Sequence, residues 1–378
     1  MEQYLMTDDQ KSYIQLVRDF FRKEVLPIRA QCDEDEHLPI EVIRKAMDMG
    51  LHTLDIPEEY GGAGLDFVTY VMLTEEMSKV DDAFTSILNA GSIACKVIAL
   101  GGTEEQKNMF YKKVVDGAFV SMCITEADAG SDVSSIAASA VRDGDDYILN
   151  GTKLFVSNGS IADYYIVFAS TDKSKGAKGI SAFLVDGTSK GLTRGRQEKK
   201  LGVHSGDTCE VSFRDVRVPA GNLLGKENEG FKLTMETLDR GRVKVAAMAV
   251  GVAQGALDYA VAYAKERQQF GQPICKFQGI QFMLADMEAS VETARQMVYY
   301  AANLIDHDKP CRRAASIAKL TATDNCMKVC TDAVQVLGGY GLSRDYPVER
   351  FFRNAKTYQI VEGTNQIQRM VIGRDLCR

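Results

Sequence analysis

The sequence predicts an α+β protein in which one β-rich segment separates two helical segments. Apolar residues recur with helical spacing before residue 120 and again after residue 228, whereas the segment between them consists of short strand-like runs bounded by turn residues. The chain has neither the βαβ alternation nor the GxGxxG motif of a nicotinamide-binding fold. We therefore expect an N-terminal α-helical domain at residues 1–120, a middle β-domain at 121–228 and a C-terminal α-helical domain at 229–378.

Start and stop signals define the helices of the two outer segments. Thr7 can cap a helix that ends around Pro27, and Thr103 with Gln106 forms a capping box for a later one. Between them, helices are expected at residues 40–49, 67–80 and 85–99, with a turn-rich loop at 56–64. In the C-terminal segment, helices are expected at 230–267, 277–306 and 312–337, and Gly338-Gly339 ends the last of these.

Turn and strand signals define the middle segment. Asp143-Gly144 and Asn150-Gly151 are predicted hairpin turns that flank the run from Tyr147 to Leu149. Strand-like runs follow at residues 164–169, 180–185 and 210–219, and the last run stops at a proline. These signals together predict a compact β-domain.

Composition argues against several classes of protein. The net charge of −7 and the pI near 5.4 argue against nucleic-acid binding, which needs a basic face. The longest strongly apolar run, residues 245–253, is too short for membrane insertion, and the first residues have no signal-peptide pattern. The nine cysteines form no CxxC motif and the four histidines no metal spacing, so we expect no metal site and a cytoplasmic location.

Glu362 is the strongest catalytic candidate. Ile360 and Val361 precede it and can exclude water, and Gly363 has no side chain to keep a ligand from the backbone. Desolvation raises the pKa of a carboxyl group and suits it to general-base work near neutral pH. The alternative is a plain helix start, in which Gly363 or Thr364 is the cap and Glu362 interacts with the helix dipole.

A second candidate segment runs from Met122 to Asp132. It combines hydroxyl groups, small residues and backbone amides, which can donate hydrogen bonds to a polar ring edge and to phosphate oxygens. The alternative is an ordinary polar loop.

Three motifs resemble the acyl-CoA dehydrogenase family, the flavoproteins that introduce an α,β double bond into acyl-CoA thioesters. Residues 125–132, Thr-Glu-x-x-Ala-Gly-Ser-Asp, resemble its flavin signature; residues 265–271, Lys-Glu-Arg-Gln-Gln-Phe-Gly, its second signature; and residues 361–364, Val-Glu-Gly-Thr, its catalytic loop. The similarity spans essentially the whole chain and favours the short-chain, butyryl-CoA-dehydrogenase-like branch. It implies a barrel-like middle domain, a C-terminal four-helix bundle and a homotetramer.

The resemblance also implies an FAD site shared between subunits. The implied FAD contacts are Met122, Ile124, Thr125, Phe155, Ser157, Arg267, Phe270, Gln278, Gln335, Leu337, Gly338, Gly339, Thr364 and Gln366. Thr125 and Ser157 should face the flavin, with a hydroxyl near N5, and residues 335–339 should reach the adenine side across a subunit interface. Arg267 has a simpler interpretation as a solvated helix residue, and residues 335–339 as a helix cap.

For the substrate, the resemblance implies contacts from Ser131, Asp239, Arg242, Val361 and Gly363. Glu362 would abstract the α-proton, with its own N–H and a ribityl hydroxyl of FAD meeting the enolate oxygen, while the β-hydride passes to flavin N5. Some relatives carry the base instead at the position of Gly241, which cannot take a proton here. Asp239 and Arg242 also have a simpler interpretation as an i,i+3 pair, and Ser131 as an N-cap.

Three residues depart from the family pattern. Ala127 replaces a usual proline, Phe155 a common tryptophan, and Val361 a usual tyrosine before the base. The loss of the tyrosine ring widens the expected acyl pocket, which favours a branched, cyclic or aryl acyl group unless another bulky residue such as Phe84 or Tyr340 compensates.

The leading functional hypothesis is therefore dehydrogenation of a short, branched, cyclic or aryl acyl-CoA, with electrons passed to an electron-transfer flavoprotein. A close alternative is an enoyl-CoA or arylacryloyl-CoA reductase that uses the same site in reverse. A third hypothesis, from a different class, is a non-catalytic relative that acts as an assembly factor; the presence of Glu362 and of the flavin motifs argues against it.

Overall fold

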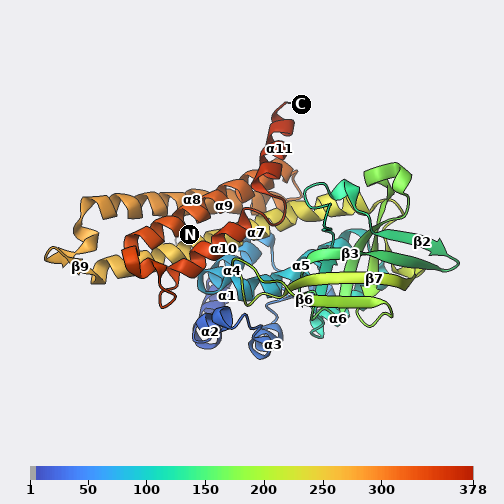
Figure 1. The fold of residues 1–378 in the computed structure, drawn as a ribbon, viewed down its shortest axis with the longest axis horizontal. Coiled ribbons are helices and arrows are strands. Elements are labelled where there is room, and N and C mark those ends of the chain that lie inside the picture. The colour runs from blue at the N-terminus through green and yellow to red at the C-terminus, as the bar shows by residue number, and fades with distance from the viewer. Residues whose placement is uncertain (1–5, 378) are drawn as a thin grey trace.

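The β-rich segment lies at one end of an elongated helical body, as the computed structural model of residues 6–377 shows (Figure 1). Helices from both ends of the chain pack together in the rest of the body. The predicted order of helical, β-rich and helical segments, and with it the α+β class, is confirmed.

Two of the six N-terminal helices, α1 and α6, begin at side-chain caps that the sequence predicts. The six helices are α1 (Asp8–Phe20), α2 (Arg29–Glu34), α3 (Ile40–Asp48), α4 (Phe67–Val80), α5 (Asp82–Gly101) and α6 (Glu104–Val115). Thr7 and Thr103 both form capping boxes, with Gln10 and Gln106 respectively. The predicted start of α5 at residue 85 is late, because the Asp81 carboxylate caps the helix by accepting from the Phe84 amide at 2.8 Å.

The middle segment forms one mixed sheet. Its strands are β1 (Val120–Cys123), β2 (Ser139–Asp143), β3 (Asp146–Ser157), β4 (Tyr164–Ser170), β5 (Ile180–Asp186), β6 (Leu192–Gln197), β7 (Thr208–Pro219) and β8 (Leu223–Leu224). The order across the sheet is β6-β7-β3-β2-β4-β5-β8, and β1 pairs with β4 in parallel. Gly144, with a φ of 61°, lies in the predicted turn between β2 and β3.

The prediction of a hairpin turn at Asn150-Gly151 is wrong. β3 continues through both residues, and its register with β7 shifts between Leu149 and Gly151. A Cβ atom on Gly151 would lie 2.6 Å from Cβ of Ala138 on the neighbouring chain segment. The glycine therefore serves a β-bulge and a close backbone approach rather than a turn.

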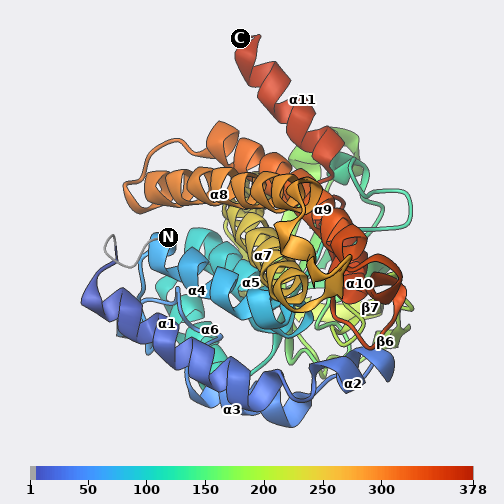
Figure 2. The same cartoon turned by 90° about the vertical axis from the view of Figure 1, so that its left-hand side faces the viewer.

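The C-terminal helices surround one long central helix. They are α7 (Gly230–Glu266), α8 (Gln278–Asp306), α9 (Arg312–Leu337), α10 (Val348–Tyr358) and α11 (Asn365–Leu376), and a short hairpin of β9 (Gln268–Gln269) and β10 (Gln272–Pro273) joins α7 to α8. α7 packs against α4, α5, α8, α9 and α10. Figure 2 shows that α11 projects from the body at the C-terminal end.

Two helices are long and apolar enough by composition to cross a bilayer, namely α5 and α7. In each of them most of the apolar window is buried inside the protein, 61% in α5 and 72% in α7. This burial is what core helices require, because their apolar side chains pack against neighbouring elements.

Candidate functional site

Glu362 lies in the short loop between α10 and α11, in a strained backbone conformation. Its φ is 54° and that of Gly363 is 87°, so a non-glycine residue occupies the left-handed region. Thr364 caps α11 by accepting a hydrogen bond from the Ile367 amide at 3.3 Å. The cap interpretation is thus right for Thr364, and the same turn presents Glu362 ahead of the helix.

Polar contacts to α9 hold both ends of this loop. The Asn365 side chain accepts a hydrogen bond from Lys319 Nζ at 2.8 Å and donates one to Asp324 at 2.7 Å. The Gln359 amide also donates to Asp324, at 2.7 Å. Because Gln359 and Asn365 flank Glu362, α9 fixes the position of the whole turn.

The Glu362 carboxyl is enclosed although the residue as a whole is only half-buried. Its Oε2 atom is buried and has no hydrogen-bond partner among residues 6–377. Burial raises the pKa of Glu362, and the nearby cations Arg242, Lys319 and Lys244 oppose this rise without cancelling it. A carboxyl group with a raised pKa and an unpaired oxygen is suited to accept a proton.

Gly241 of α7 provides the space for this carboxyl. A Cβ atom at position 241 would lie 2.7 Å from Glu362 Oε2 and 3.9 Å from Ile93 Cδ1 of α5. The Glu362 carboxyl therefore reaches into the junction of α5 and α7, and only glycine at position 241 leaves room for it there.

Gly241→Ala should slow proton abstraction without harming the fold. The added methyl group displaces the flexible end of the Glu362 side chain. A misplacement of about 1 Å can lower the rate of proton abstraction by roughly 10²-fold. Alanine is also the better helix former by about 1 kcal/mol. Stopped-flow flavin reduction checks the rate; Gly373→Ala in α11, where a Cβ meets nothing within 4 Å, is the control. A wild-type rate in Gly241→Ala would contradict this placement of the carboxyl.

Asp239 and Arg242 form a pair with each other. Arg242 NH1 lies 2.6 Å from Asp239 Oδ1, and Arg312 Nε lies 3.3 Å from Asp239 Oδ2. Arg242 is also among the cations that lower the pKa of Glu362. The i,i+3 interpretation is therefore what the structure shows, and contact of either side chain with CoA stays a prediction.

The first group of predicted flavin residues gathers where β1 meets β3. The Leu154 amide donates to the Thr125 carbonyl at 2.8 Å, which brings the signature loop beside the end of β3. Phe155 is 63% exposed at a φ of 54°, and Ser157 is also exposed. Met122 and Ile124 are half-buried and buried respectively, so they support this surface rather than form it.

A buried ion pair fixes the same loop. Lys153 is fully buried, and its Nζ donates to Glu126 Oε1 at 2.7 Å and to the Ile124 carbonyl at 3.0 Å. The Glu126 carboxylate also accepts from the amides of Ala137 and Ala138, at 2.6 and 3.1 Å. The Glu126 side chain of the signature therefore makes its contacts inside the fold.

The second group surrounds a cavity of about 500 Å³ at the β9–β10 hairpin. Arg267, Leu337, Gly338 and Gly339 line it, and the Arg267 guanidinium lies 5.4 Å from the centre of the Tyr340 ring. Three more predicted residues are exposed nearby in sequence, namely Phe270, Gln278 and Gln335.

One chain does not bring the two groups together. The β9–β10 hairpin and β3 lie at opposite ends of the body (Figure 1). Of the remaining predicted residues, Ser131 and Gln366 are exposed and Val361 is 38% exposed next to the base.

Sequence reasoning missed two lysines near the base. Lys319 is fully buried on α9, and Lys244 is 2% exposed on α7. A lysine within the apolar stripe of Ala315, Ala322 and Cys326 was a usable signal for Lys319. Lys244 pairs with Asp55, 189 residues away, which no local pattern indicates.

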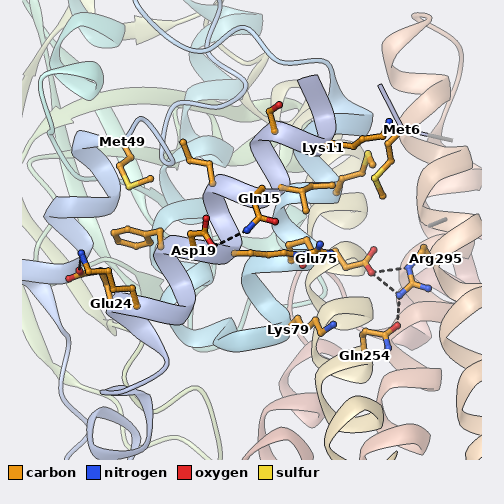
Figure 3. A pocket seen from close by; sticks show the side chains of 18 of the residues that line it. Met6, Lys11, Gln15, Asp19, Glu24, Met49, Glu75, Lys79, Gln254 and Arg295 are labelled. Atoms are coloured by element: carbon orange, nitrogen blue, oxygen red, sulfur yellow. Dashed lines mark hydrogen bonds and ion pairs between the residues drawn. The ribbon is translucent and has the colours of Figure 1, made fainter. Parts of the chain in front are cut away.

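Another cavity, of about 1270 Å³, lies elsewhere, between α1, α4, α7 and α8 (Figure 3). None of the predicted site residues lines it. Its most buried charges are mutually paired, since Arg295 donates to Glu75 at 2.8 Å and Tyr299 to Glu75 at 3.0 Å. This cavity is therefore not the candidate catalytic site.

The pH dependence of flavin reduction should report the raised pKa of Glu362. The ionised fraction of the base grows as the pH rises through that pKa, so the acid limb of the rate should lie above the ordinary value of 4.5. Lys319→Met removes a cation that lowers this pKa and should move the limb to still higher pH. Lys328→Met, an exposed lysine of α9 paired with Asp332, should leave it in place. An unmoved limb in Lys319→Met would contradict the electrostatic role of Lys319.

Comparisons with known proteins agree along the whole chain. The family models described as acyl-CoA dehydrogenase N-terminal, middle and C-terminal domains match residues 7–118, 121–216 and 228–377. The short-chain-specific acyl-CoA dehydrogenase of Clostridium acetobutylicum is 44% identical over 99% of both chains. Subunit CarC of the caffeyl-CoA reductase-Etf complex of Acetobacterium woodii is 42% identical over 97% of both chains.

Solved structures show the same fold. Butyryl-CoA dehydrogenase from Megasphaera elsdenii superimposes with a TM-score of 0.97 at 44% identity, covering 99% of both chains. This similarity confirms the expected arrangement of a helical, a β and a helical domain. The chain belongs to the acyl-CoA dehydrogenase family of FAD-dependent flavin oxidoreductases.

Proposed function

We propose that the protein dehydrogenates short acyl-CoA thioesters, with Glu362 as the base that removes the α-proton. The observation that carries this proposal is the Glu362 carboxyl, which is buried, has an unpaired Oε2 within the described residues, and reaches the space above Gly241. The proton would pass to this carboxylate, whose raised pKa favours the protonated product of the step.

The residues present fit FAD. Phe155 offers an exposed aromatic face beside the exposed Ser157 hydroxyl, and Arg267 with the backbone of Gly338 and Gly339 lines a cavity of about 500 Å³. We propose that these two groups hold the cofactor, with Thr125 and Thr364 near its reactive part. When bound, FAD supplies the redox chemistry by accepting the β-hydride.

The assembly, the redox partner and the location of the protein are each proposed on a separate observation. The two groups lie at opposite ends of the chain, which supports a homotetramer in which each FAD is completed by a second subunit (Figure 1). An electron-transfer flavoprotein is the proposed acceptor, because a close relative is named as part of a complex with Etf. The nine unpaired cysteines support a cytoplasmic location.

For the acyl group we propose a branched, cyclic or aryl chain. Val361, beside the base, is smaller than the tyrosine usual in the family, and this leaves room near the reacting carbons.

Reduction of an enoyl-CoA or arylacryloyl-CoA is the second candidate. It is favoured by the 42% identity to a subunit named for caffeyl-CoA reductase. Both directions need the same acid–base residue, because Glu362 would return the proton that it removes in the other direction.

A flavin-bleaching screen tests the proposal. The FAD-loaded protein is mixed with saturated linear, branched, cyclic and aryl acyl-CoAs, and each should bleach the flavin if it is a substrate. Rapid reoxidation of the reduced flavin by enoyl-CoA, without turnover of the saturated thioesters, would instead support the reductase. A colourless protein that cannot take up FAD would overturn both candidates and favour the assembly factor.

A further inference from the structure

A buried polar cluster lies next to the proposed base. Apart from the effect of Lys244 on the pKa of Glu362, it has no part in the mechanism above. Its centre is an ion pair in which Lys244 Nζ of α7 lies 2.7 Å from Asp55 Oδ2. Ser92 of α5 donates to the same carboxylate at 2.7 Å and accepts from Lys244. The Lys244 ammonium also lies 4.2 Å from the centre of the Tyr70 ring of α4. We define Asp55, Tyr70, Asn89, Ser92 and Lys244 as the polar cluster.

The position of the cluster follows from two contacts between α5 and α7. Ile93 is beside Gly241, where Glu362 reaches in, and Ser92 is beside Lys244. Lys244 follows Gly241 by three residues, so it lies on the same face of α7, roughly 5 Å along the axis. The cluster therefore lies about one helical turn beyond the base.

The cluster contains an unused hydrogen-bond donor. Asn89 is 6% exposed, and its Oδ1 accepts from the Tyr70 hydroxyl at 2.7 Å. Its Nδ2 is buried without a partner in the part of the chain that the structure describes. A buried amide without an acceptor is costly, so a ligand that supplies an oxygen there gains selective affinity.

The charges of the cluster are already balanced. Lys244 is compensated by Asp55, and Ser92, Tyr70 and Asn89 are neutral. An anionic group placed here would be repelled by the Asp55 carboxylate as well as attracted by the Lys244 ammonium. A neutral oxygen acceptor meets no such repulsion and can pair with the free N–H of Asn89.

We propose that the polar cluster recognises the far end of the acyl group and selects thioesters that carry an uncharged oxygen acceptor, such as a hydroxyl group, there. This inference rests on the proposed function, since it places the thioester between Glu362 and the cluster. An alkyl end would leave Asn89 unpaired and bring apolar carbon against a buried ion pair. A site built to bond an oxygen rejects the analogue that lacks it.

The test compares three thioesters on the wild-type FAD-loaded enzyme, matched in the number of carbon and oxygen atoms along the acyl chain. These are 4-hydroxybutyryl-CoA, pentanoyl-CoA, in which a methyl replaces the hydroxyl, and succinyl-CoA, in which a carboxylate takes that end. The measured quantity is the rate of flavin reduction divided by the apparent dissociation constant. The reverse direction uses the matching enoyl thioesters to reoxidise the reduced flavin. We expect a preference of about tenfold or more for the hydroxyl thioester over the other two.

A variant assigns the preference to the cluster. Asn89→Leu should bring the ratio of hydroxyl to methyl thioester close to one, whereas Asn108→Leu, at an exposed position of α6, should keep the wild-type ratio. Loss of the preference in both variants, or in neither, would overturn the assignment.

The wild-type result alone also decides the proposal, whether or not the variant folds. Equal or faster reaction with pentanoyl-CoA would overturn the inference and leave acyl-CoA dehydrogenation intact. Fastest reaction with succinyl-CoA would overturn it in favour of an anionic substrate. Failure of all three thioesters in both directions, in protein whose flavin another acyl-CoA of the bleaching screen reduces, would overturn the inference alone. Failure of every acyl-CoA of that screen as well, in protein that holds FAD, would overturn the proposed function.

Discussion

Glu362→Gln should bind FAD normally and lose flavin reduction by acyl-CoA by at least about 10³-fold, as expected when a positioned general base is removed. The amide has the shape of the carboxylate but cannot accept the α-proton. The change is mild for the fold, because Oε2 of Glu362 has no hydrogen-bond partner within residues 6–377 to lose. Anaerobic stopped-flow spectroscopy measures the loss at the flavin absorbance band.

Glu59→Gln provides the matched control. Glu59 is an exposed glutamate of the N-terminal segment, and its replacement should leave the reduction rate within twofold, about the scatter expected for a neutral surface change. Retention of the wild-type rate in Glu362→Gln would remove Glu362 from the chemistry, whatever its burial.

Lys153→Met should lower the free energy of unfolding by about 3–5 kcal/mol, because it leaves the buried Glu126 carboxylate without its cation. Lys153 is fully buried and 2.7 Å from Glu126, whose oxygens also hold the amides of Ala137 and Ala138. Burial lowers the pKa of Lys153, although Glu126 opposes this shift. Denaturant unfolding, followed by helical circular dichroism and by flavin release, measures the effect.

Two further variants distinguish the loss of a buried ion pair from the loss of a lysine side chain in general. Lys175→Met removes an exposed partner of Asp172 and should leave the free energy of unfolding almost unchanged. Adding Glu126→Gln to Lys153→Met should recover part of the stability, since no unpaired charge then remains buried. If Lys153→Met lowered the free energy of unfolding no more than Lys175→Met, the Lys153–Glu126 pair would not stabilise the signature loop.

Local sequence signals predicted most of the secondary structure. Capping residues such as Thr7 and Thr103 act within one helical turn, so a short window of sequence contains the whole cause. Gly151 was misassigned because its role depends on Ala138 and on the register of β7, which are set by tertiary pairing. An Asn-Gly pair signals a turn only where the flanking strands pair with each other.

The candidate site could also be predicted only in part from local sequence signals. Glu362 was predicted from its neighbours in sequence together with the family motif, and its role as the base stays a prediction. Its enclosure over Gly241 depends on α7, and its anchoring depends on Asp324 and Lys319 of α9. The Asp55–Lys244 pair joins residues 189 apart, so it emerges only once the loop that carries Asp55 is packed against α7. Asp239 and Arg242 illustrate the opposite case, because their three-residue spacing on a helix already indicated the pair that forms.

The most direct test of the account is a crystal structure of Glu362→Gln with FAD and a saturated acyl-CoA bound. We expect the side chain at position 362 to face the carbon next to the thioester carbonyl, with the flavin ring on the opposite face of the acyl group. A thioester bound away from residue 362, or a side chain at 362 that points into solvent, would contradict it.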